Sequence, residues 1–228
     1  MRRSEEVGLS MNFTFVTRGK FEDFLAHDVA RLRQPDVLIL SEGIVGECDL
    51  LKEADGSSNR FFQLANLSEE LSCVLICGMD TSVCGILHRS AAVFDCGRLL
   101  GVSDMTYTSE DTPYTPGGGF RVYDTTAGKI GVVVGEDLYV PEVLHTLALC
   151  ESDVIVSIFG KIRTPIPQLM LRASAFCNGV YLCMSAKGYV QIADICGELA
   201  CALDASMLEY HLDIVKDYRP VHTRKRGY

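Results

Sequence analysis

The sequence predicts a single α/β domain with mixed rather than purely parallel strand pairing. Short apolar runs typical of buried strands alternate with segments whose apolar residues recur at helical spacing. Two hairpin-like strand pairs interrupt this alternation in the middle of the chain, which favours mixed pairing. The chain has 228 residues, 48% of them hydrophobic, so it can form one core without disulfides or a metal.

The first third of the chain is expected to contain three strands and two helices. Residues 12–16, 36–40 and 73–77 are short apolar runs and predict strands. Residues 21–33 and 58–70 place their apolar side chains on one side of a helix.

The middle of the chain predicts two hairpins separated by a loop. Residues 86–94 and 98–102 bracket the turn Asp95-Cys96-Gly97, a pattern typical of a hairpin. Residues 120–123 and 130–134 are expected to pair around a second turn, and residues 108–119 are rich in Ser, Thr, Pro and Gly and predict a loop.

The last third returns to alternating helices and strands. Pro141 opens a predicted helix over 141–149, since proline is favoured in the first turn of a helix. The remaining expected elements are a strand at 154–159, a helix at 167–177, a strand at 180–185 and a further strand at 189–196. We expect one domain over 11–217, an N-terminal extension over 1–10 and a basic tail over 218–228.

Charge and composition exclude several classes of protein. The formal net charge of −9, without a strong basic stripe, argues against a nucleic-acid partner. No apolar run reaches the length of a membrane-spanning helix, and residues 1–6 do not resemble a secretory signal, so we expect a cytoplasmic protein without a membrane partner.

Ten cysteines are present, and none forms a C-x-x-C pair. Most of them lie inside apolar runs. We therefore expect reduced thiols that pack as small hydrophobic side chains, rather than ligands of a metal. No metal and no cofactor is expected.

Two strand ends are candidates for chemistry. Glu42 follows the strand at 36–40, where α/β sheets place ligand-binding groups, although such an acid can also be a solvated residue or a helix cap. Gly135-Glu136-Asp137 follows the strand at 130–134 and leads toward Pro141. Its glycine spacing does not fit a phosphate-binding loop, so a plain strand-to-helix turn is the other interpretation.

Taken in order, three segments resemble the carbon–nitrogen hydrolase (nitrilase) superfamily. Residues 36–42 resemble the strand that ends in that family's catalytic glutamate. Residues 90–107 resemble the segment with its catalytic lysine, and residues 128–142 resemble the segment with its nucleophilic cysteine. Residues 203–228 are similar to the family's closing stretch. The resemblance covers nearly the whole chain and implies a four-layer α-β-β-α sandwich in one domain.

The departures from the family pattern concern its catalytic residues. In that family the glutamate takes the thiol proton, the cysteine attacks the amide or nitrile carbon, and the lysine stabilises the charged oxygen. Glu42 matches the glutamate, but Met105 stands at the lysine position and Gly135 at the cysteine position. Glu110 corresponds to a second family glutamate, in the loop before the cysteine segment.

A glycine cannot act as a nucleophile, and losing the nucleophile of such a catalytic unit costs about 10⁶ in rate. The resemblance therefore implies a degenerate member, a pseudoenzyme that binds a small ligand or regulates a partner. The alternative is an active amidase-type hydrolase that uses a displaced nucleophile, with Ser41, Cys48 or Lys161 as candidates, or an activated water. The residues expected to contact the ligand are Glu136, Phe159, Gly160 and Lys161.

Met105 removes the lysine's charge, so Glu42, Glu110 and Glu136 are expected to share a pocket without a fixed cation. Like charges in such a site do not all ionise, and the expected ligand is therefore an amine or an amide, with a divalent metal as a weaker alternative. The resemblance also implies a homodimer, paired through the helix at 141–149, with Val143, Leu144, Leu147 and Ala148, and through the C-terminal tail.

Overall fold

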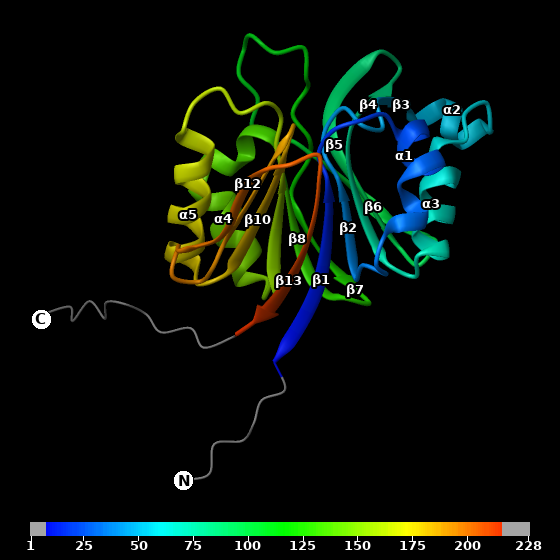
Figure 1. The fold of residues 1–228 in the computed structure, drawn as a ribbon. Helices are drawn as coiled ribbons and strands as arrows, with labels where there is room; N and C mark the ends of the chain where they lie inside the picture. Colours follow the sequence, from blue (N-terminus) through cyan, green and yellow to red (C-terminus); the bar gives the residue numbers. More distant parts are fainter. Residues whose placement is uncertain (1–7, 216–228) are drawn as a thin grey trace, which may run out of the picture.

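The computed structural model describes residues 8–215 as two stacked β-sheets with helices on both outer faces (Figure 1). The layers follow one another as helices, sheet, sheet, helices, and this confirms the expected α-β-β-α sandwich in a single domain. The expected tail over 218–228 and most of the expected extension over 1–10 lie outside the described residues. β1 begins at Leu9, within the range assigned to the extension.

The first sheet has seven strands in the order β13-β1-β2-β4-β5-β6, with β3 paired to β4. β1 runs parallel to β2, and β2 parallel to β4, whereas β4, β5 and β6 form antiparallel pairs. The pairing is therefore mixed, as the sequence predicted. Its strands are β1 (Leu9–Val16), β2 (Val37–Leu40), β3 (Glu47–Asp49), β4 (Val74–Val83), β5 (Ile86–Asp95), β6 (Arg98–Asp104) and β13 (Met207–Ile214).

The second sheet has six strands in the order β12-β11-β10-β9-β8-β7. Its central strands β8, β9 and β10 are parallel, and antiparallel strands lie on either side of them. Its strands are β7 (Arg121–Thr125), β8 (Gly128–Val134), β9 (Val154–Ile158), β10 (Tyr181–Ala186), β11 (Tyr189–Ala193) and β12 (Leu199–Asp204).

The helices divide between the two outer faces. The first sheet is covered by α1 (Phe21–His27), α3 (Arg60–Glu70) and the short α2 (Leu50–Asp55), and the second sheet by α4 (Pro141–Leu149) and α5 (Ile166–Asn178). Two 3₁₀ turns, η1 (Val29–Arg31) and η2 (Gly135–Tyr139), complete the chain.

The period-2 alternation of strand side chains creates three separate apolar layers. In β2, Val37 and Ile39 face the second sheet, while Leu38 and Leu40 face the helices. In β9, Val156 and Ile158 face the first sheet. Each buried side chain of this size contributes about 1.5–3 kcal/mol, so the strand register fixes which residues reach the space between the sheets.

The structure differs from the sequence predictions in three ways. The helix predicted over 21–33 ends at His27 and is followed by η1, because the Asp28 amide still bonds to Phe24 four residues back, whereas the amides of Arg31 and Leu32 bond three residues back. The short or exposed elements β3, α2 and β12 were not predicted, since they have no apolar periodicity of their own. β13 was also missed, although it pairs with β1 along its whole length.

All ten cysteines are free thiols, but only four of them are buried. Cys84, Cys96, Cys150, Cys177 and Cys196 are exposed at turns and helix ends, so the expectation of mostly buried cysteines is wrong for half of them. Between residues 8 and 215, no helix combines the length and the apolarity needed to cross a bilayer.

Candidate functional site

A cavity of about 560 Å³ lies at the C-terminal ends of β2, β8, β9 and β10. The carboxyl ends of parallel strands are where α/β sheets place ligand groups, and the cavity joins the two sheets there. It is lined by Glu42, Gly43, Arg89, Gly135, Glu136, Tyr139, Phe159, Gly160, Lys161, Arg163, Thr164, Pro167 and Lys187.

Glu42 is held at this mouth by close backbone packing. A Cβ at Gly78 of β4 would lie against Ile158 and 2.8 Å from the Glu42 nitrogen, so only glycine fits beneath the turn. A Cβ at Gly160 would lie 3.1 Å from Glu42 Oε2. The preceding Ser41 hydroxyl meets the Ser185 hydroxyl of the second sheet at 2.5 Å. The two glycines therefore let the Glu42 turn fit closely between the sheets.

The Glu42 carboxylate forms an ion pair with Arg89. Arg89 Nη2 lies 3.1 Å from Glu42 Oε1, and both side chains are about four-fifths buried. Burial raises the pKa of Glu42, although the nearby Arg89 and Lys187 charges act in the opposite direction. Glu42 Oε2 has no hydrogen-bond partner among the described residues. This oxygen is itself buried, next to the Gly160 backbone.

Asp80 and Tyr114 complete the surroundings of Arg89. Asp80 lies opposite Arg89 in the β4–β5 ladder, and Arg89 Nε is 3.9 Å from Asp80 Oδ1. Arg89 donates to the Tyr114 hydroxyl over 2.8 Å, and Tyr114 donates to Asp80 over 3.1 Å. The guanidinium carbon also lies 4.4 Å from the centre of the Tyr114 ring. Arg89 is therefore held by three neighbours at the floor of the cavity.

The turn after β8 begins with a residue that has no side chain. Gly135 has φ = +57°, in the left-handed region, and it begins η2. A Cβ at this position would lie 2.6 Å from Met105 Sδ. The Glu136 amide donates to the same sulfur over 3.4 Å. The thioether of Met105 thus fills the space beside Gly135 and occupies the first backbone donor of the turn.

Asp137 fixes Met105 in this place. Its buried carboxylate accepts hydrogen bonds from the Thr106 amide and the Tyr107 amide, each over 2.8 Å, and from the Thr106 hydroxyl over 3.0 Å. Burial raises the pKa of Asp137, and these three bonds oppose that rise. The segment after β6 is therefore attached directly to the turn after β8.

The structure brings most of the predicted site residues together. Glu42, Gly135, Glu136, Phe159, Gly160 and Lys161 all line the cavity, and Met105 is buried directly against Gly135. Glu110 does not join them, because it is exposed in the loop between β6 and β7 and does not line the cavity. The loop places Tyr114, four residues later, against Arg89 instead.

The expectation of a pocket without a fixed cation is wrong. Arg89, Lys161, Arg163 and Lys187 all line it, and Arg89 pairs with Glu42 directly. Sequence reasoning missed Arg89, although a signal was present. Arg89 lies two and four residues before Ala91 and Val93, which face the second sheet, so it shares their face of the strand. The same alternation from Val74 and Ile76 places Asp80 on that face.

The alternative nucleophiles are in different positions. Cys48 is buried among the residues that pack between the first sheet and its helices, and burial raises the pKa of its thiol to about 11. Ser41 is fully buried and paired with Ser185. Lys161 lines the cavity and is exposed at its rim. Of the three candidates, only Lys161 is in the cavity.

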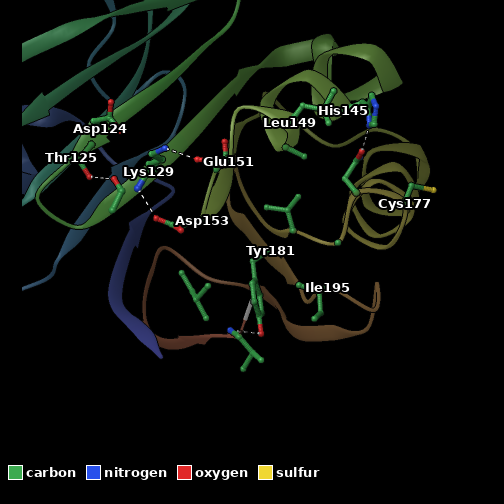
Figure 2. Close-up of a pocket in the computed structure, with 18 residues that line it drawn as sticks. Asp124, Thr125, Lys129, His145, Leu149, Glu151, Asp153, Cys177, Tyr181 and Ile195 are labelled. Carbon is green, nitrogen blue, oxygen red and sulfur yellow. Dashed lines mark hydrogen bonds and ion pairs between the residues drawn. The ribbon is translucent and has the colours of Figure 1, made fainter. Parts of the chain in front are cut away.

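A larger cavity, of about 750 Å³, lies at the opposite end of the second sheet (Figure 2). It adjoins the beginnings of β8, β9 and β10 rather than their ends. Lys129 pairs with Glu151 there over 3.0 Å, and the Lys129 amide donates to Asp153 over 2.8 Å. Lys129 and Glu151 are thus engaged with each other, and we take the Glu42 cavity as the better candidate for chemistry. Within residues 8–215 no cluster of three or more His, Cys, Asp or Glu side chains could hold a metal ion.

Comparison with known proteins agrees with this arrangement. The family model described as carbon-nitrogen hydrolase matches residues 30–206. None of the curated protein sequences compared with the chain matches it.

Solved structures have the same fold at low sequence identity. The chain is similar to Saccharomyces cerevisiae Nit3, a member of branch 10 of the nitrilase superfamily, with a TM-score of 0.79 and 15% identity over 98% of this chain and 99% of that one. A carbon-nitrogen hydrolase of Helicobacter pylori G27 matches with a TM-score of 0.73 and 17% identity, covering 91% and 90%. The amidase of Nesterenkonia sp. AN1, solved with acrylamide added at its active site cysteine, matches with a TM-score of 0.72 and 15% identity, covering 92% and 94%. With the family match extending over most of its length, the chain belongs to the carbon–nitrogen hydrolase family.

Proposed function

We propose that this protein is a non-hydrolysing member of its family, which binds a small ligand in the Glu42 cavity or regulates a partner through it. The observation that supports this is the contact between Met105 and Gly135. The position beside Gly135 where a nucleophilic side chain would begin is occupied by Met105 Sδ, and the Glu136 amide already donates to that sulfur. Both a nucleophile and a free oxyanion donor are missing from this turn.

Intact-mass spectrometry tests the proposal. The purified chain is incubated with a panel of small amides and esters, and acyl adducts and released ammonia are measured. We expect no acyl adduct on the protein, and we expect ammonia to be released no faster than in buffer without the protein. An adduct on any residue of the cavity would contradict the proposal.

A second candidate function is supported by Glu42 itself. Burial raises the pKa of its carboxyl, and Oε2 has no hydrogen-bond partner among the described residues. Glu42 would act as the general base for a water that reaches this carboxyl. The protein would then be an amidase that uses activated water, with Lys161 near the developing charge. Ammonia release that disappears in Glu42→Gln but persists in Glu110→Gln would support this function, since Glu110 lies outside the cavity.

We also propose a homodimer, but through a surface different from the one expected. Val143, Leu144 and Leu147 of α4 are buried in the chain's own core, so they are not available to a partner. On α5, three exposed apolar side chains lie on one stripe: Ile166 is 51%, Leu169 63% and Phe176 44% exposed. An isologous contact would bring this α5 stripe against its copy.

Light scattering tests the dimer. We expect twice the mass of the chain at micromolar concentration and a monomer for Leu169→Asp. Phe62→Asp is the matched control, because Phe62 is 65% exposed on α3 of the other helical layer. A monomeric parent protein would contradict the proposal, and so would dissociation caused equally by both variants.

A further inference from the structure

The lining of the Glu42 cavity has a charge opposite to that of the whole protein. Four cationic side chains, Arg89, Lys161, Arg163 and Lys187, face two carboxylates, Glu42 and Glu136. The complete chain has a formal net charge of −9. A concave site with the opposite sign concentrates ions of its counter-charge, and here these ions are anions.

The carboxylates of the cavity do not balance its cations. Glu42 is already paired with Arg89 at 3.1 Å, so neither charge of this pair is fully available to a ligand. Glu136 then remains against Lys161, Arg163 and Lys187. An amine entering the cavity would meet this excess of positive charge. The sequence-based expectation of an amine depended on a pocket without a fixed cation, which the structure does not have.

The helix α5 adds to the same potential. It begins at the cavity, where Thr164 and Pro167 contribute to the lining. The N-terminal end of a helix carries a partial positive charge that favours anions, although this effect alone is no more than about 1 kcal/mol. The partial charge of the helix therefore adds to the positive potential of Lys161, Arg163 and Lys187, which remain the main source of that potential.

The remaining walls limit the type of anion. Tyr139 and Phe159 line one side and meet edge to face, with ring centres 5.9 Å apart. They offer an apolar surface to a short carbon chain. The Glu136 amide, which could contribute to a phosphate cradle, already donates to Met105.

We infer that the cavity binds a small carboxylate, with the acid group held by Lys161, Arg163 and Lys187 and the carbon chain against Tyr139 and Phe159. The inference rests on the proposed function, since it describes a ligand that is bound and not hydrolysed. The cavity of about 560 Å³ is in the usual range for a small-molecule site.

The test compares three four-carbon probes of different charge at matched ionic strength. Succinate, succinamide and 1,4-diaminobutane are titrated into the full chain by calorimetry, with thermal shift as a second measurement. We expect binding of succinate and at least tenfold weaker binding of the other two. Lys161→Met with Lys187→Met should weaken succinate binding about tenfold, the effect of losing a charge-assisted hydrogen bond.

Lys129→Met is the matched control, because it removes a lysine from the cavity at the other end of the sheet. It should leave succinate binding unchanged. Tighter binding of 1,4-diaminobutane would overturn the inference, and so would an equal loss in the control. Binding of inorganic phosphate as tight as that of succinate would identify a general anion site and overturn the carboxylate assignment.

The two proposals can fail separately. Hydrolysis of amides by the same preparation, with succinate binding intact, would contradict the proposed function alone. Absence of succinate binding in a protein that also forms no acyl adduct would contradict the carboxylate inference alone.

Discussion

The turn after β2 and the turn after β8 face the same cavity, but their side chains serve different purposes. The first presents Glu42, whose carboxylate contacts Arg89 and has one oxygen without a hydrogen-bond partner in the described part of the chain. The second presents Gly135, and the space beside it is filled by the Met105 thioether. The first turn therefore keeps a carboxylate at the cavity. In the second turn, the Met105 thioether occupies the place where a reactive side chain would begin.

This difference also appears in how each turn tolerates a methyl group. At Gly78, beneath Glu42, a Cβ would meet Ile158 and the backbone of Glu42, neither of which can move away easily. At Gly135 it would meet the end of the flexible Met105 side chain. We expect Gly78→Ala to cost about 3 kcal/mol of unfolding free energy and Gly135→Ala about 1–2 kcal/mol, measured by chemical denaturation.

Two controls separate space from backbone strain. Gly43 has φ = +84° and open space around its Cβ position, so Gly43→Ala gives the cost of the left-handed backbone alone. Gly118 has open space without a positive φ, and Gly118→Ala should be nearly neutral. If Gly135→Ala lowers the unfolding free energy as much as Gly78→Ala, the Met105 contact is as rigid as the packing under Glu42. The two turns would then not differ in the way described.

The next effect concerns Arg89. We expect Arg89→Met to lower the unfolding free energy by about 2 kcal/mol, because it leaves Glu42 and Asp80 without their shared cation in a largely buried place. The matched control is Arg33→Met, which removes the exposed ion pair with Glu209 and should cost less than about 1 kcal/mol. Equal losses in the two variants would show that Arg89 is no more important than a surface arginine.

Introducing a cysteine and a lysine at the second turn should produce a reactive thiol that faces Glu42. In Gly135→Cys with Met105→Lys, the new lysine places a positive charge near the introduced thiol and stabilises its thiolate. A thiol pKa one to two units below its usual value raises the thiolate fraction near neutral pH by about tenfold. We therefore expect iodoacetamide to label Cys at position 135 about ten times faster in the double variant than in Gly135→Cys alone.

Peptide mapping must distinguish this label from that on the five exposed native cysteines. Gly135→Ser with Met105→Lys is the control and should show only their background labelling. An introduced thiol that stays unreactive would show that the turn after β8 does not face Glu42 in the way described.

The smallest effect is the pH dependence of Glu42. Burial raises its pKa in the folded chain, so the folded state binds this proton more tightly than the unfolded state. The protonated carboxyl thus favours folding at low pH, and this contribution is lost as the pH rises through the folded-state pKa. We expect Glu42→Gln, which cannot titrate, to gain stability relative to the parent protein between pH 4 and pH 7.

Denaturation curves at several pH values measure this gain. Glu110→Gln is the control, and because Glu110 is exposed it should follow the parent protein at every pH. A Glu42→Gln variant that instead loses stability relative to the parent as the pH rises would show that the Arg89 ion pair outweighs burial.

Much of the fold could be predicted because its strands are nearly continuous apolar runs. β2, β8 and β9 were recognisable from apolar runs of five or six consecutive residues, and the β5–β6 hairpin from its turn. β12 and β13 could not be found in this way. They lie at sheet edges with mostly exposed or half-buried side chains, so neither has an apolar run. β12 pairs with the adjacent β11, whereas β13 pairs with β1, which is distant in sequence.

The sequence by itself determined the chemical identity of the site residues. A carboxylate follows β2, and a glycine without any nucleophilic atom follows β8. Only the tertiary structure decided that Arg89 pairs with Glu42, that Met105 fills the space beside Gly135, and that Glu110 stays outside. The physical reason is that alternation along a strand tells which face a side chain takes. Its partner across the two sheets depends on contacts between residues far apart in the chain.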